Sequence, residues 1–363
     1  MGVVGVRPGI SVVGTLARAH RRAVRDGHAE VGSGHVLRYG AIRVRELYGY
    51  PLPGSLRWRL RPAPVDPDPP AGRARLFPAF DRQVELFADG AVREATFDGG
   101  PGAVTFSPLV RHAVYEAVHE ASRRDGVPAG VGHLLAAVFA EAGSAAVEVA
   151  ARLRGSVHLD RQSPGYRAGD ESPPWAPEAL KVAGVLPSED SRAGRLLFAV
   201  ASRALRRRGN RYRHPIPVLV EGDARRQAVR LGRAYTGTVD VLLSMLELHE
   251  QLDRAGAELP DPVARYNGAG RILREHGITY LAALTAAAEL PAVPHVAEPV
   301  GSSGRPSRHS RPAFDAEADA ALRTASAAGG PYGTTQQLAS ILHDSEGSAA
   351  RLLTVLGVDP LHL

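Results

Sequence analysis

Residue types that carry out covalent or metal chemistry are scarce in this sequence. The chain has no cysteine, which excludes thiol nucleophiles, disulfides and thiolate metal sites. It lacks the G-x-x-x-x-G-K-[ST] pattern of a phosphate-binding loop, and its single lysine, Lys181, lies in Leu180-Lys181-Val182. The patterns H-E-x-x-H and G-x-S-x-G are also missing, and His112 and His119 are spaced as on a solvated helix face. We therefore expect a non-enzymatic protein with no cofactor and no metal.

Arginine provides nearly all of the positive charge, and the formal net charge is +6. The densest cluster comprises Arg203, Arg206, Arg207, Arg208, Arg211 and Arg213. One interpretation is an anion-binding surface for nucleic acid, because guanidinium groups pair with phosphate in bidentate fashion. The other is a coding bias toward arginine, combined with cations at the C-terminal end of a predicted helix over 191–208. Both interpretations remain open.

The composition is that of a globular protein rich in helices. The chain has 363 residues, of which 44% are hydrophobic and only 6% aromatic, enough for two or three domains. No apolar run reaches the roughly 18 residues of a membrane-spanning helix. Residues 1–14 lack the basic start and continuous apolar run of a signal peptide. We expect a cytoplasmic protein without membrane contact.

Proline and glycine divide the chain. Pro-rich segments cover 51–72 and 163–187, and a stretch rich in Gly, Ser and Pro covers 291–312. Helical periodicity between them predicts an all-α fold without a substantial sheet. The predicted helices are 15–26, 107–125, 132–141, 145–153, 191–208, 223–231, 239–250, 271–276, 316–327, 336–343 and 349–356.

Internal similarity is the strongest signal. Gly-Ser-Ala-Ala occurs at 143–146 and again at 347–350, each time after an apolar segment entered through a Gly-containing turn. A second pair of similar segments is 26–37 and 231–242, in which one helix ends near a glycine and Ser33 or Thr238 is placed to N-cap the next. The pattern predicts short helices joined by brief turns.

These motifs, in this order, resemble the repeat of the N-terminal domain of Clp-family protein unfoldases, of the ClpC and ClpA type. We place four degenerate copies at about 15–40, 104–160, 215–286 and 312–363. In that family two repeats form one domain. The resemblance therefore implies two Clp-N-like helical bundles, 1–160 and 188–363, joined by a Pro-rich linker over 161–187. It also implies the receptor module of an unfoldase without its ATPase motor.

The resemblance points to a peptide-binding groove. It implies that Phe106 and Ser107, and Phe314 in the fourth copy, line a groove where adaptors, substrates or cyclic peptide antibiotics dock. The alternative is that Phe106 only packs on the helix that follows it, as a hydrophobic staple. His35 and His133 occupy the position of the motif histidine, which mainly supports the start of a helix.

The sequence departs from the family at one position, and this departure argues against phosphoarginine binding. Relatives that bind phosphoarginine use a glutamate that is replaced here by Gly34, Gly132, Val239 and Thr335 in the four copies. Binding of apolar peptides or protein partners is then the more consistent expectation.

The leading hypothesis is therefore a binding module that acts as an adaptor or regulator of a Clp protease, or as a decoy that sequesters peptides or cyclic peptide antibiotics. The alternative is an Arg-rich, nucleic-acid-binding regulatory protein.

Overall fold

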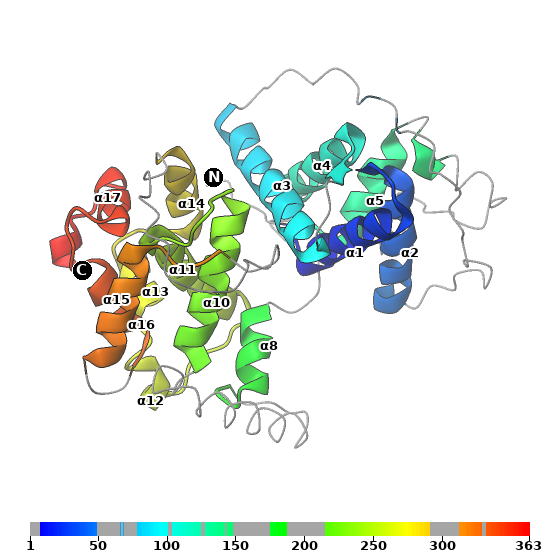
Figure 1. Ribbon diagram of the computed structural model, residues 1–363. Helices are drawn as coiled ribbons and strands as arrows, with labels where there is room; N and C mark the ends of the chain where they lie inside the picture. The colour runs from blue at the N-terminus through cyan, green and yellow to red at the C-terminus, as the bar shows by residue number, and fades with distance from the viewer. Residues whose placement is uncertain are drawn as a thin grey trace, which may run out of the picture. The chain divides into compact units, whose positions relative to one another are not determined.

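The computed structural model confirms an almost entirely helical protein. It describes residues 8–48, 66, 68, 78–100, 104–124, 128–141, 144–147, 175–186, 215–290, 312–328 and 332–363. The chain divides into two compact units, residues 1–172 and 173–363 (Figure 1). In the described part of the chain, no helix combines the length and hydrophobicity that crossing a bilayer requires. The arginine cluster 203–213 and the predicted helix 191–208 lie outside the described residues, as does all but the last residue of the 291–312 stretch.

Unit 1 contains five longer helices and a pair of two-residue strands among its described residues. The elements are α1 (Ile10–Asp26), β1 (Glu30–Val31), α2 (Ser33–Tyr48), α3 (Pro78–Gly99), β2 (Thr105–Phe106), α4 (Pro108–Arg124) and α5 (Val131–Ala140). The strands pair in parallel, with Val31 opposite Phe106. One apolar core joins the helices, and many of its members are alanine or valine, so the helices approach closely.

The helix α3 was not among the helices predicted from the sequence. It carries a stripe at helical spacing, Ala88, Ala91 and Ala95, that is buried in the same core as α1. The stripe consists mainly of small residues, and the Pro-rich segment directly precedes it. For these two reasons the helical spacing of its apolar residues was not recognised in the sequence.

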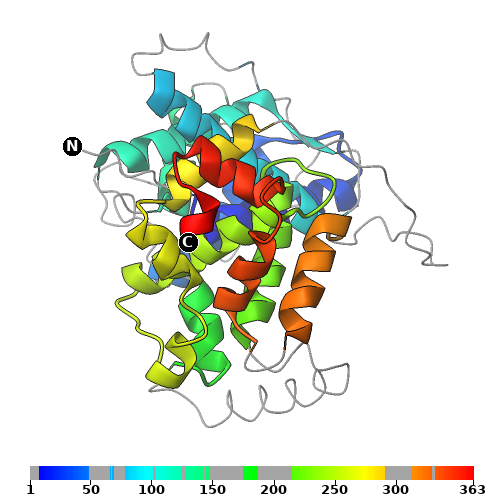
Figure 2. The same cartoon turned by 90° about the vertical axis from the view of Figure 1, so that its left-hand side faces the viewer.

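Unit 2 has a larger set of helices. They are α8 (Trp175–Val182), α10 (Pro215–Arg230), α11 (Thr238–Arg254), α12 (Asp261–Ala264), α13 (Ala269–Glu275), α14 (Tyr280–Glu289), α15 (Ala316–Ala327), α16 (Thr334–Ile341), α17 (Ser348–Val355) and a final 3-10 turn, η2 (Pro360–His362). The long α11 is central, packing on α10, α13, α14, α17 and α8. The helices α15 and α16 lie side by side in both views (Figures 1 and 2).

Two helix boundaries of unit 2 differ from the sequence expectation. Helix α10 begins eight residues before the predicted 223, because Pro215 and Pro217 stand in its first turn, where no backbone donor is needed. Helix α8 lies inside the segment expected to be a linker. It packs on α10 and α11, and the Ala176 amide donates to Gln251 Oε1 at 3.0 Å.

The same local arrangement occurs in both units. Gly27 and Gly232, with φ of 71° and 70°, end the first helix of each pair in the left-handed conformation. Four residues later the chain pairs in parallel with the segment before another helix: the Ser107 amide donates to Val31 O at 3.2 Å, and the Asp315 amide to Thr236 O at 3.0 Å. Residues paired by sequence similarity thus occupy equivalent places.

Candidate functional site

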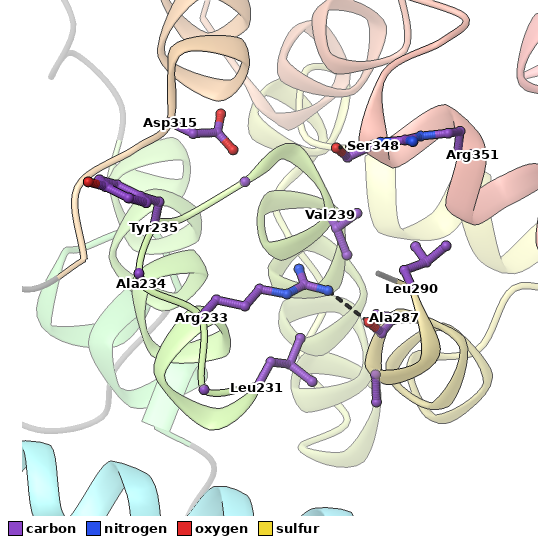
Figure 3. Close-up of a pocket in the computed structure, with 13 residues that line it drawn as sticks. Leu231, Arg233, Ala234, Tyr235, Val239, Ala287, Leu290, Asp315, Ser348 and Arg351 are labelled. Atoms are coloured by element: carbon purple, nitrogen blue, oxygen red, sulfur yellow. Dashed lines mark hydrogen bonds between the residues drawn. The ribbon is translucent and has the colours of Figure 1, made fainter. Parts of the chain in front are cut away.

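The main candidate site is a pocket of about 600 Å³ in unit 2. It lies between the α10–α11 loop, the end of α14, the residue before α15 and the start of α17 (Figure 3). It is therefore formed between the 231–290 part of unit 2 and the segment 315–351. Its lining residues are Leu231, Gly232, Arg233, Ala234, Tyr235, Gly237, Val239, Ala287, Ala288, Leu290, Asp315, Ser348 and Arg351.

The pocket has an apolar wall, and its polar lining includes one exposed arginine, Arg351, and the acidic residue Asp315. Leu231, Val239 and Leu290 provide the apolar surface, and the side chain of Tyr235, a residue that is 40% exposed, points away from them (Figure 3). Arg351 is exposed, and its guanidinium makes only a long 3.4 Å contact to Ser348 Oγ. No carboxylate pairs with Arg351 among the described residues. The pocket can therefore take an apolar side chain that has a negative group next to it.

Arg233 fixes the loop that forms one side of the pocket. Its Nη1 is 2.9 Å from Asp240 Oδ1, and its Nη2 donates to Ala287 O at 2.8 Å (Figure 3). Asp240 Oδ2 also accepts from the Gly237 amide at 2.8 Å. Burial raises the pKa of Asp240 to about 6, although the charge of Arg233 acts to lower it. The loop is thus held to both α11 and α14 before any ligand arrives.

A partly buried carboxylate, Glu317, joins the starts of two helices at the edge of the pocket. Glu317 Oε1 accepts from Thr238 Oγ at 2.7 Å and from the Ser348 amide at 2.9 Å, and Glu317 Oε2 accepts from Ser348 Oγ at 3.1 Å. Thr238 Oγ in turn accepts from the Ala349 amide at 3.1 Å. We call this set the Glu317 clasp. It ties the N-termini of α11 and α17 to α15. The negative charge of Glu317 is favourable there because a helix N-terminus carries a partial positive charge.

Unit 1 has an equivalent clasp with a carboxylate from elsewhere in the chain. Asp66 accepts from Ser33 Oγ at 2.5 Å, the Ser33 amide at 2.7 Å, Ser107 Oγ at 2.8 Å and the Ala145 amide at 3.3 Å. Ser33 Oγ accepts from the Ala146 amide at 3.0 Å, across 113 residues; the matching Thr238 bond spans 111. We call this set the Asp66 clasp. In the aligned position of Glu317 unit 1 has Leu109, so the acidic group comes from the Pro-rich segment instead.

The predicted groove residues do not line the pocket. Phe106 is 3% exposed and belongs to the core of unit 1, with its ring centroid 5.9 Å from that of His20. Ser107 is buried and accepts from the Val110 amide at 3.3 Å as an N-cap. The partly buried ring of Phe314 lies 4.8 Å from the guanidinium of Arg225. The next residue, Asp315, is the one that reaches the pocket.

The histidines of the repeats occupy helix starts. Nδ1 of His35 accepts from the Gly32 amide, and Nδ1 of His133 from the Gly130 amide, each at 3.2 Å. Burial and the nearby His28 lower the pKa of His35 to about 4, so its ring is neutral at pH 7. His112 lies near Glu116 and Glu141, at 3.9 and 3.7 Å.

A buried polar network lies beside the pocket-forming helices. Gln227 Nε2 donates to Asp223 Oδ2 at 3.0 Å and also to Glu247 Oε2. Ser244 Oγ donates to the same Asp223 oxygen at 3.0 Å, and Arg230 pairs with Glu247 at 2.8 Å. Burial and the charge of Glu247 raise the pKa of Asp223 to about 7. The folded protein therefore binds a proton here more tightly than the unfolded chain does.

This network predicts a specific pH dependence. Because the folded pKa of Asp223 lies above the ordinary value of 3.8 for an aspartate, its contribution to stability is present at low pH and is lost as pH rises from about 4 to 7. The slope approaches about 1.4 kcal/mol per pH unit within that window. The variant Asp223→Asn should lack this slope, as measured by denaturant unfolding between pH 4 and 8. Parallel profiles for the two proteins would contradict the assignment.

Sequence reasoning did not identify Tyr235 or Arg351 as site residues. The alignment of the similar segments held one signal, since the position of Val239 is the one where the repeat that this chain resembles has a glutamate. For Asp66 no signal was available, because it lies outside every repeat. No protein family, curated protein or solved structure matches this chain.

Proposed function

We propose that the protein is a non-catalytic peptide- or protein-binding module related to the N-terminal domains of Clp unfoldases. The observation that carries the proposal is the unit 2 pocket, which lies at the junction of two repeats and is preformed by the Arg233–Asp240 pair. Its volume of about 600 Å³ is in the usual range for ligand sites. Two Clp-N-like bundles, each built from two degenerate repeats, account for the equivalent clasps of the two units.

The pocket chemistry narrows the ligand class. An apolar side chain would pack on Leu231, Val239 and Leu290, and an acidic group beside it would pair with Arg351. The glutamate with which relatives bind a guanidinium is absent, and Val239 makes that part of the wall apolar. The proposed partners are Clp unfoldase or protease components, peptides or cyclic peptides, which the protein would bind as an adaptor, a regulator or a decoy.

The test is binding of fluorescein-labelled peptides that carry one leucine or phenylalanine, with and without an adjacent aspartate. Purified Clp unfoldase is the second probe. The wild-type chain should bind the apolar–acidic peptides best. Leu231→Ala and Arg351→Glu should each weaken that binding by about tenfold or more, because a few contacts carry most of the affinity in such pockets.

The matched control is Arg323→Glu, an exposed arginine on α15 that pairs with Asp319 and does not line the pocket. It should bind peptide as the wild type does. Equal loss in the control, or no peptide binding by the wild type, would contradict the proposal. A labelled DNA duplex serves as a counter-probe: tight binding that falls steeply with salt would favour the nucleic-acid alternative.

A further inference from the structure

Three potential metal ligands converge in unit 1, next to the Asp66 clasp but without sharing a residue with it. One ligand atom from each of Asp26, His28 and His35 lies within 4.8 Å of the other two. Asp26 is the last residue of α1, and His35 lies in the first turn of α2. Gly27, in the left-handed conformation, turns the chain so that His28 faces back toward them.

The two imidazole rings already aim at one point. His28 Nδ1 and His35 Nε2 are 2.8 Å apart and share a proton in a hydrogen bond. Asp26 is oriented by Arg22, whose Nε donates to Asp26 Oδ2 at 2.6 Å. His35 is buried, while Asp26 and His28 are partly exposed, so the group is open to solvent on one side.

We propose that Asp26, His28 and His35 bind one Zn²⁺ ion. Two imidazole nitrogens and one carboxylate oxygen are a ligand set that zinc prefers, at distances near 2.0–2.2 Å. The exposed side leaves a fourth tetrahedral position for water. The ion would link the end of α1 to the start of α2 across the 27–32 loop.

Coordination requires one proton to move. The Gly32 amide donates to His35 Nδ1 at 3.2 Å, so neutral His35 carries its proton on Nε2 and donates it to His28. When zinc takes the Nε2 lone pair, that proton transfers to Nδ1 through solvent and the Gly32 bond is lost. No net proton is released. The start of α2 stays in place because Ser33 remains bound to Asp66.

The second repeat offers a matched control. His133 makes the same bond with the Gly130 amide, at 3.2 Å, as His35 makes with Gly32. Among the described residues it belongs to no convergent group of three potential metal ligands. His112 is a further control, because it lies close to two carboxylates but not in a convergent group of three.

The experiment uses the full chain, stripped with a chelator, and Zn²⁺ or Co²⁺ as probe. Competition with a chromophoric chelator should show one equivalent of zinc bound, and Co²⁺ should give the intense visible bands of tetrahedral coordination. His28→Ala and Asp26→Asn should each weaken zinc binding by about 100-fold or more, since even outer-shell changes cost 10–100-fold. His133→Ala and His112→Ala should bind zinc as the wild type does.

A thermal shift provides the second readout. Zinc should raise the melting temperature of the wild type and of His133→Ala, and should leave that of His28→Ala unchanged. Three results would overturn the proposal. They are zinc binding that persists in His28→Ala, an equal loss of binding in His112→Ala, and no binding by the wild type with zinc in excess. None of these outcomes bears on the peptide pocket, which lies in the other unit.

Discussion

Replacing Arg233 by alanine should destabilise unit 2 by about 3–5 kcal/mol, the cost of leaving a buried charge without its partner. Asp240 is fully buried, and its side chain pairs with Arg233 at 2.9 Å. The variant also frees Ala287 O, so the α10–α11 loop loses its tie to α14. Denaturant unfolding combined with hydrogen exchange, which reports each unit separately, measures the loss.

The penalty should depend on pH. Without Arg233 the pKa of Asp240 rises further above 6, so Asp240 becomes neutral at mildly acidic pH and the loss shrinks. The control is Arg271→Ala, whose pair with Glu275 is 65% and 57% exposed. It should cost about 0.5 kcal/mol or less. A similar cost for both variants would show that the Arg233 pair is not a buried one in solution.

Replacing Asp66 by alanine should destabilise unit 1 by about 2–4 kcal/mol, because hydrogen bonds to a charged group are worth more than neutral ones. The change leaves the Ser33 amide, Ser33 Oγ, Ser107 Oγ and the Ala145 amide without their acceptor. Water can reach part of this site, which keeps the loss below the sum of four bonds. Hydrogen exchange should increase at the starts of α2 and α4 and leave unit 2 unchanged.

The control lies two residues away. Asp68 is exposed and comes from the same Pro-rich segment, so Asp68→Ala should change stability by less than about 0.5 kcal/mol. The variant Glu317→Ala should produce the corresponding loss in unit 2 alone. A loss of stability in Asp68→Ala equal to that in Asp66→Ala would indicate an effect of segment charge rather than of the clasp.

Much of the helical organisation could be predicted from the sequence, because glycines and N-cap residues mark the ends and starts of helices in the similar segments. The glycines at 27 and 232 and the N-cap positions 107 and 315 lie where the motifs place them. Helices α3 and α14 were missed because no repeat motif marks them. Their buried faces consist mainly of alanine, which gives only a weak contrast between apolar and polar sides, although alanine itself favours a helix.

The candidate site was harder to predict for a physical reason. Phe106 and Phe314 occupy equivalent sequence positions, but one is enclosed by the alanine- and valine-rich core of unit 1 and the other is partly exposed beside Arg225. Whether an aromatic ring faces solvent depends on packing from elements far away in the sequence. The pocket residues came from a loop and from helix ends that only the fold brings together.

The clasps have a consequence for folding kinetics. Each joins segments as far as 113 or 111 residues apart in the chain, so it closes only after most of its unit has assembled. Interactions that form after the transition state slow unfolding and leave the folding rate nearly unchanged. The two carboxylates are therefore expected to set how long each unit stays folded rather than how fast it folds, and to do so independently of each other.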